Sequence, residues 1–148
     1  MIEVEVEDDA WTQALADPAA LARRAAAAAA RGESGEIVIL LTDDDVLRSL
    51  NGQFLGKDRP TNVLAFPAGV TGRLGDVALA FGVCEAEARE QGKSLADHLI
   101  HLVIHGVLHL IGYDHLTDDD ATRMESLERQ LLGEMNIEDP YADVRHRS

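Results

Sequence analysis

The sequence predicts one small domain of the α/β (α+β) class over residues 1–148. Its length suffices for one domain with a core of its own and is too short for two ordinary ones. Four short strand-like runs are interspersed with five segments of helical pattern, and no internal repeat or long linker divides them. Apolar residues make up 46% of the chain, a share that is typical of globular proteins. From about residue 142 we expect a loose tail.

Predicted strands and helices alternate in the first half of the chain. Residues 2–6 alternate between apolar and acidic side chains, which indicates a strand with one wet face. Residues 17–32 have a capping aspartate, a proline in the first turn and a final glycine, so we expect a helix. The apolar run over residues 36–42 is typical of a buried strand. Residues 43–55 begin with capping side chains and continue with apolar ones at helical spacing.

Two further strands and three helices are expected in the second half. Residues 62–66 and the region near 76–81 are short apolar runs bounded by proline or glycine, as strands commonly are. Residues 82–91 have a helical pattern that ends at a glycine. The longest predicted helix, residues 94–111, opens with a serine cap, and residues 117–135 form a last amphipathic helix.

The charge distribution leaves room for a local basic site. The formal charge of −14 argues against general binding to nucleic acid, because phosphates favour Lys and Arg. The acids, however, are concentrated near the N-terminus and in two short runs. A small basic or metal-bearing cleft within an acidic surface is therefore compatible with the composition. The basic residues in the middle of the chain are Lys57, Arg59, Arg73 and Lys93.

The sequence has no pattern for export or for a membrane span. Its acidic, alternating start lacks the basic region and apolar core of a secretory signal, and no apolar run approaches about 20 residues. The single cysteine, Cys84, has no partner for an internal disulfide. We therefore expect a cytoplasmic protein without a membrane partner.

The stretch HLVIHGVLHLIGYDH, residues 101–115, places four histidines within fifteen positions. His105 and His109 lie one helical turn apart, so both imidazoles can bind one ion. Gly112 can turn the chain after the helix and bring His115 back as a third ligand. Catalytic zinc sites commonly combine three protein ligands with one open position, so the pattern predicts one Zn²⁺ held by this trio.

Other interpretations of these histidines stay open. They can be ordinary core or surface residues, and we expect His98 and His101 to support the site or the fold. A structural zinc usually has four protein ligands, often cysteines, and no cysteine lies near in the sequence. Asp114 could be a fourth ligand, but we expect it to orient the site as a hydrogen-bond acceptor. A catalytic metal site is therefore favoured over a structural one. Three imidazoles would also suit nickel or copper, so the identity of the ion stays open.

Gly106 occupies the position directly after the first predicted ligand. In zinc proteases of the H-E-x-x-H type, a glutamate there acts as general base. Glycine has no side chain, which argues against hydrolysis of peptides. A phosphodiester brings its own charged oxygens, which a metal ion can bind while it stabilises the charge that develops.

Together with LNGQFLGKDRPTNVLAFP and LGDVALAF, the histidine stretch resembles the YbeY family of bacterial endoribonucleases, which are rRNA maturation factors. The likeness covers roughly residues 36–141 and extends only loosely to residues 1–35. It implies a mixed four-stranded sheet packed with about five helices, and a zinc ion on His105, His109 and His115. It also implies a single-strand-specific, metal-dependent endoribonuclease that matures the 3′ end of 16S rRNA and takes part in ribosome quality control.

The segment that leads into the third predicted strand departs from that family at one important position. The family arginine that is thought to contact RNA phosphate is replaced by Leu55, which cannot pair with phosphate. Phe54 takes the place of Tyr or Trp, and Ala65 that of a serine. We therefore weigh a second function, that of a non-catalytic, zinc-bound ribosome assembly factor.

The remaining site assignments concern charge near the metal. Lys57 and Arg59 are expected to bind the RNA backbone in place of the missing arginine. We also expect Arg59 to take part in catalysis, together with Asp114, His105, His109 and His115. Asp76 is expected to bind substrate or to help form the cleft. The implied partners are single-stranded ribosomal RNA and the ribosome or its small subunit.

Overall fold

The computed structural model describes residues 1–114 and 116–140, so the predicted ligand His115 and the predicted tail lie outside the described residues. The strands are β1 (Ile2–Val6), β2 (Glu36–Thr42), β3 (Val63–Val70) and β4 (Arg73–Ala80). They form one four-stranded mixed sheet in the order β1-β2-β4-β3. β1, β2 and β4 run parallel, and β3 runs antiparallel to β4 at the edge of the sheet.

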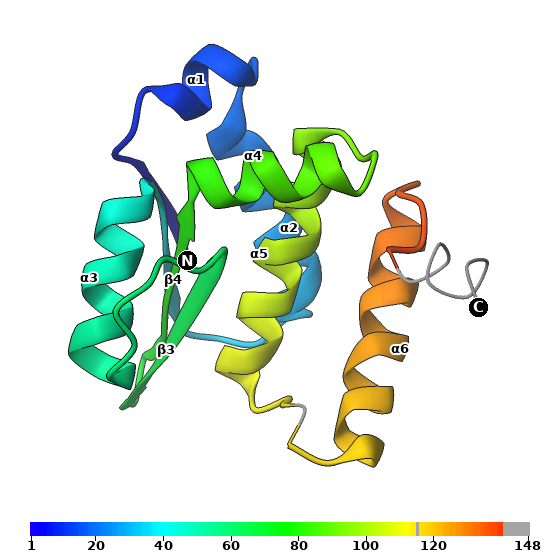
Figure 1. Cartoon of the computed structure of the whole chain (residues 1–148). Coiled ribbons are helices and arrows are strands. Elements are labelled where there is room, and N and C mark those ends of the chain that lie inside the picture. Colours follow the sequence, from blue (N-terminus) through cyan, green and yellow to red (C-terminus); the bar gives the residue numbers. More distant parts are fainter. Residues whose placement is uncertain (115, 141–148) are drawn as a thin grey trace.

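Helices cover both faces of this sheet (Figure 1). They are α1 (Ala10–Ala14), α2 (Pro18–Ala30), α3 (Asp44–Leu55), α4 (Phe81–Glu90), α5 (Leu95–Ile111) and α6 (Asp118–Glu134). α3 lies against one face, whereas α2 and α5 pack together on the other. α6 packs on the outer side of α5, and α4 follows β4 directly at the end of the sheet.

The predicted fold class is confirmed, with two corrections to its elements. The described part of the chain contains six helices rather than about five, because α1 has only five residues, too few to show a helical period. Its Trp11 is fully buried and donates from Nε1 to the Thr42 carbonyl oxygen at 2.9 Å. β3 continues through Pro67, where the sequence predicts a stop. An edge strand tolerates a proline, because one of its sides needs no ladder donor.

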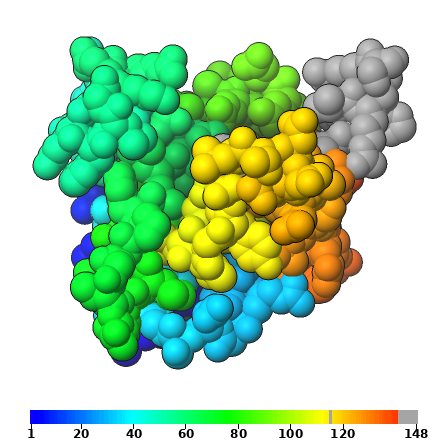
Figure 2. All heavy atoms as spheres, turned by 90° about the horizontal axis from the view of Figure 1, so that it is seen from below, coloured from blue at the N-terminus to red at the C-terminus, as the bar shows by residue number. Residues whose placement is uncertain are grey.

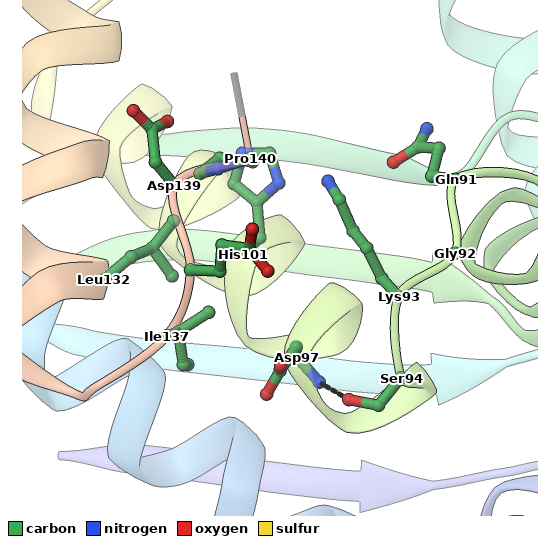
Figure 3. A pocket seen from close by; sticks show the side chains of 11 residues that line it. Gln91, Gly92, Lys93, Ser94, Asp97, His101, Leu132, Ile137, Asp139 and Pro140 are labelled. Atoms are coloured by element: carbon green, nitrogen blue, oxygen red, sulfur yellow. Dashed lines mark hydrogen bonds between the residues drawn. The ribbon is translucent and has the colours of Figure 1, made fainter. Parts of the chain in front are cut away.

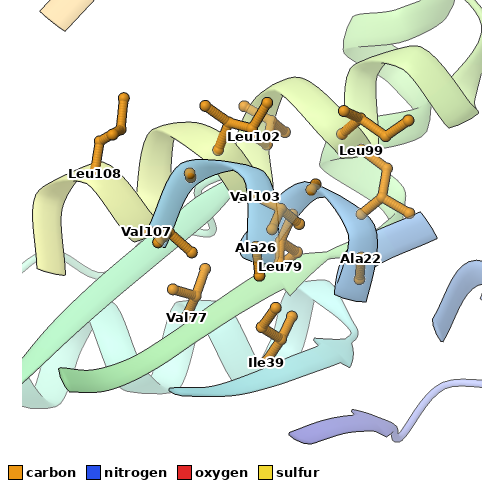
Figure 4. Close-up of a cluster of buried hydrophobic side chains, with 14 of the residues drawn as sticks. Ala22, Ala26, Ile39, Val77, Leu79, Leu99, Leu102, Val103, Val107 and Leu108 are labelled. Carbon is orange, nitrogen blue, oxygen red and sulfur yellow. The ribbon is translucent and has the colours of Figure 1, made fainter. Parts of the chain in front are cut away.

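The main core lies between the sheet and the α2–α5 pair (Figure 4). Alternate residues of the central strands point to this side, among them Ile39, Val77 and Leu79, all inaccessible to solvent. The alanine tract of α2 is buried here as well, and its small side chains let the helix pack closely. The opposite face forms a second cluster with α3, made of Leu47, Leu64, Ala78 and Ala80. This alternation decides which strand residues can reach α5.

α5 begins and ends where the sequence predicts. Ser94 Oγ accepts a hydrogen bond from the backbone N–H of Asp97 at 3.1 Å, which caps the N-terminus of the helix. Gly112 ends the helix with φ +115°, a conformation that residues with a β-carbon rarely adopt. Local signals therefore set the length of the helix that carries the histidines.

Among the described residues, no single helix is both long and apolar enough to cross a membrane. α4 and α5 together would meet the criteria of length and composition, but only as a pair bent by 116°.

Candidate active site

Four histidines follow one another along α5. Ring centroids are 6.3 Å apart for His98 and His101, 6.5 Å for His101 and His105, and 4.9 Å for His105 and His109. His98 is buried, whereas the other three are partly exposed. The closest two rings therefore belong to the two described residues that the sequence predicts to bind metal.

Glu128 of α6 joins two of these histidines. Its side chain is completely buried, and one carboxylate oxygen, Oε1, lies 3.0 Å from both His101 Nε2 and His105 Nδ1. Met124 and Leu131 of the same helix are buried in the main core. An acid thus stands within the apolar stripe of α6, and two imidazoles of α5 contact it there.

Two opposing effects decide the charge of Glu128. Burial raises the pKa of a carboxyl group, and here it is the largest single cause. The hydrogen bonds with His101 and His105, together with the charge of those rings, outweigh burial and lower the pKa of Glu128 to about 2. An ionised carboxylate only accepts hydrogen bonds, so the ring nitrogens that face it must carry hydrogen. His105 therefore donates through Nδ1, and a metal ion on this ring would bind Nε2.

Gly106 lies where α5 rests on the sheet. A β-carbon built on it would be 2.7 Å from Val77 Cγ1 and 3.4 Å from Val63 Cγ2. Valine is branched at Cβ and has little rotamer freedom, so Val77 cannot withdraw easily. The structure thus gives a packing reason for glycine beside the first predicted ligand. A glutamate general base at this position would not fit between the helix and β4.

Two adjoining hollows connect the histidine pair with residues 56–62, the loop before β3 that contains Lys57 and Arg59 and is called the basic loop below. The histidine pair and Gly106 line one of them, and Lys57 and Arg59 line the other. The residues that line both are Leu55, Asn62 and Leu64. In Figure 2 the end of α5 (yellow) lies between the β3–β4 segment (green) and α6 (orange). An extended ligand could therefore contact the basic loop and the histidines together.

The basic loop contains an acid between its two cations. Arg48 of α3 donates from Nε to Asp58 Oδ1 at 2.8 Å, and this hydrogen bond lowers the pKa of Asp58. Asn51 Nδ2 donates to the Arg59 carbonyl oxygen at 2.9 Å, which ties the loop backbone to α3. Lys57 and Arg59 are exposed. Because Arg48 neutralises the acid, the loop presents net positive charge beside the hollows.

Asn62, which borders both hollows, is held by Glu87 of α4, and Glu87 in turn contacts His98 of α5. Its Nδ2 donates to both carboxylate oxygens of Glu87, at 3.0 and 3.3 Å, and its Oδ1 accepts from the backbone N–H of Val63. His98 Nε2 lies 2.9 Å from Glu87 Oε1. Burial lowers the pKa of His98 against the opposing influence of Glu87, so the ring favours its neutral form. This connected set of side chains fixes the start of β3 relative to α5.

Two other predicted site residues, Asp76 and Asp114, are not among the residues that line the hollow at the histidine pair. Asp76 is ion-paired with Arg73 at 3.0 Å and precedes Val77, so strand alternation points it to the α3 face of the sheet. Asp76 is not among the residues that line either of the two adjoining hollows. Asp114 Oδ1 accepts from the backbone N–H of Leu116 at 3.3 Å and lines another hollow with Arg123.

A further hollow lies beside the start of α5 (Figure 3). The connection between α4 and α5, which includes Lys93, bounds one side of it, and Ile137 and Asp139 after α6 bound the other. His101 lines this hollow and also contacts Glu128. His101 thus contacts the buried carboxylate of Glu128 and also lines this hollow. The hollow that His105 and His109 line is a separate one.

The sequence reasoning missed Glu128 and Asn62. A signal for Glu128 existed, because it follows Met124 by four positions and precedes Leu131 by three, the spacing of one apolar helical face. An acid on such a face needs a partner in the core. No comparable local signal exists for Asn62, since Glu87 lies on a different element.

A metal centre here needs a ligand beyond the described histidines. Among residues 1–114 and 116–140, no three His, Cys, Asp or Glu side chains gather closely enough to hold an ion. The predicted third ligand, His115, lies outside those residues. Fold and site together define an α+β protein in which a histidine pair on a core helix lines a cleft beside a basic loop.

Comparison with known proteins identifies the family to which the chain belongs. Residues 3–136 match the family model described as endoribonuclease YbeY. Proteins named endoribonuclease YbeY from Paramagnetospirillum magneticum and Azorhizobium caulinodans are 46% and 48% identical, over 96% and 95% of this chain and 96% of each relative. The solution structure of TM1509 from Thermotoga maritima is similar, with a TM-score of 0.58 and 26% identity over 92% of both chains. The chain belongs to the YbeY family.

Proposed function

We propose that this chain is a metal-dependent endoribonuclease that cleaves single-stranded ribosomal RNA. The observation that carries the proposal is the pair of adjoining hollows, which brings Lys57 and Arg59 next to His105 and His109. Relatives that match this chain over nearly its whole length are named endoribonucleases, which supports phosphodiester chemistry.

The donor chemistry of the cleft fits one zinc ion. His105 and His109 supply imidazoles one helical turn apart, and we propose His115 as the third ligand. Glu128 contacts the other nitrogen of His105, as carboxylates commonly do behind metal-bound histidines. When bound, the ion would supply Lewis-acid stabilisation of the negative charge that develops on the scissile phosphate.

The remaining residues of the cleft would bind and place the RNA. Lys57 and Arg59 would attract backbone phosphates, and both side chains are long enough to follow a flexible strand. Gly106 lets α5 lie close to β3 and β4, so the histidine pair lines the same hollow as the first residues of β3. Leu55 offers an apolar surface where the two hollows meet.

The cellular role that we propose follows the family resemblance. The substrate would be the 3′ end of 16S rRNA, and the partner would be the ribosome or its small subunit in the cytoplasm. A part in ribosome quality control would use the same cleavage chemistry. Each of these proposals rests on RNA cleavage, so that activity is tested first.

The decisive experiment compares three proteins, each incubated with zinc, on a labelled single-stranded RNA that contains the 3′ region of 16S rRNA. These are the parent, His109→Ala and Arg89→Ala. Arg89 is exposed on α4 and outside both hollows, which makes it a control for loss of an unrelated side chain. We expect the parent and Arg89→Ala to cleave the RNA and His109→Ala to lose cleavage while it keeps a folded circular dichroism spectrum.

Two results would contradict the proposal. Cleavage by His109→Ala at the parental rate would remove the metal mechanism. Equal cleavage of the single strand and of the same sequence annealed to its complement would remove the single-strand specificity.

One observation favours a second candidate, a non-catalytic ribosome assembly factor with bound zinc. Leu55 is 55% exposed and lines both hollows, so an apolar side chain occupies the place where phosphate contact is expected. This function predicts that the zinc-loaded parent sediments with small ribosomal subunits and cleaves none of their RNA. Zinc-dependent cleavage by the parent would exclude it.

A further inference from the structure

The contact between α5 and α6 includes a buried charge that the packing of two amphipathic helices does not require. Glu128 is inaccessible to solvent, and burial of a lone carboxylate is costly unless it is hydrogen-bonded and paired. A leucine or methionine at this position would be the ordinary choice for the apolar face of α6. The acid is therefore explained by its partners rather than by the core.

The partners of Glu128 are two histidines on successive turns of α5. A single oxygen lies 3.0 Å from His101 Nε2 and 3.0 Å from His105 Nδ1. The two rings approach it with different nitrogens, so the shared acceptor restrains both ring orientations at once. The side chain of His101 is 14% exposed and that of His105 is 25% exposed, so solvent competes little for the contact.

We propose that Glu128 is a positioning residue of the metal centre, which holds His105 as its Nδ1–H tautomer and reserves Nε2 for the ion. His101 supports this role, because its Nε2 hydrogen bond restrains the same carboxylate from the neighbouring turn. The inference rests on the proposed metal function of His105 and adds a residue that acts through the ligand without touching the ion. Partners of this kind commonly change metal affinity by 10–100-fold when they are replaced.

The test uses Glu128→Gln, which keeps the shape of the side chain and removes its charge, with Glu125→Gln as the matched control. Glu125 lies on the same helix but is partly exposed, and its Oε1 lies 4.0 Å from Nη2 of Arg129. Zinc affinity is measured by competition with a chromophoric chelator. We expect Glu128→Gln to bind zinc about 10–100-fold more weakly than the parent. Glu125→Gln should bind as the parent does.

A second readout does not depend on activity or on zinc. Two-bond ¹H–¹⁵N spectra of the metal-free protein report which nitrogen of each histidine ring carries hydrogen. We expect the Nδ1–H form of His105 in the parent and in Glu125→Gln, and a mixture of forms in Glu128→Gln. If Glu128→Gln fails to fold, the parent spectrum still decides, because an Nε2–H form of His105 would overturn the proposal.

The outcomes separate this inference from the proposed function. Equal zinc affinity of Glu128→Gln and the parent would overturn the role of Glu128 and leave the metal centre intact. A parent protein that binds no zinc would contradict the metal centre itself, and with it the role of Glu128 toward a ligand.

Discussion

Gly106 and Val77 are packed so closely that a β-carbon on residue 106 would lie 2.7 Å from Cγ1 of the valine. This contact joins the histidine helix to the central strand β4 directly beside His105. It determines how near the histidine pair lies to β3, whose first residues line the same hollow. The glycine therefore has a structural role that is independent of the chemistry of its neighbours.

Replacing Gly106 should destabilise the protein. In Gly106→Ala the new methyl group forces Val77 or α5 to move, and overpacking of this kind costs about 1–3 kcal/mol of unfolding free energy. Urea denaturation followed by circular dichroism measures the change. Gly133→Ala is the control, because a β-carbon there meets no atom within 4 Å, and alanine should stabilise a helix by about 0.5–1 kcal/mol. Equal stability of Gly106→Ala and the parent would show that the helix is not pressed on β4.

Lys57 and Arg59 should contribute salt-dependent affinity for single-stranded RNA. If each contacts one phosphate, then Lys57→Ala or Arg59→Ala reduces the slope of log K against log salt by about 0.7. Fluorescence anisotropy with a labelled RNA at several salt concentrations measures this slope. Arg89→Ala, which removes the same kind of charge from α4, should leave the slope unchanged. An unchanged slope in both loop variants would show that neither Lys57 nor Arg59 contacts an RNA phosphate.

Leu55→Arg should strengthen RNA binding. The side chain is 55% exposed between the two hollows, so arginine can extend along the cleft without burial of its charge. The unfolding free energy should change by no more than about 0.5 kcal/mol. Leu55→Gln separates the effect of charge from that of polarity and should bind RNA as the parent does. If Leu55→Arg binds and cleaves RNA no better than the parent, the leucine does not limit RNA binding or cleavage at this site.

Cys84 should make the protein less stable in alkaline solution. The thiol is completely buried, and burial, together with the nearby charges of Glu87 and Asp44, raises its pKa well above the usual 9.0. Above pH 9.0 the unfolded chain releases this proton and the folded chain retains it, so stability falls as pH rises. The loss attributable to this thiol is up to about 1.4 kcal/mol per pH unit.

Comparison of the parent with Cys84→Ala isolates that contribution from other alkaline groups. Urea denaturation at a series of pH values from 8 upward, roughly one unit apart, gives both curves. The difference in unfolding free energy between the two proteins should be constant below pH 9.0 and should drift in favour of Cys84→Ala above it. A constant difference at every pH would mean that the folded thiol ionises normally.

The helices and their limits were largely predictable, because their signals are local. Asp17 accepts a hydrogen bond from the Ala20 backbone N–H at the start of α2, and Thr117 does the same for Asp120 at the start of α6. Such caps act over three residues, so the sequence displays them directly. The short helix α1 was not predicted because its five residues are too few to show a helical period.

The sequence by itself determined the α5 helix, its caps and the spacing of His105 and His109, since each depends on residues within a few positions of one another. Only the tertiary structure decided that Glu128 contacts His101 and His105 and that Gly106 meets Val77. It likewise decided that Asp76 lies on the α3 face of the sheet, opposite the histidine helix. These facts depend on how a helix of one segment lies on a strand or helix of another, and no local periodicity encodes that placement. The packing of α5 between the sheet and α6 therefore places Glu128 beside His105 and brings the first residues of β3 to the same hollow.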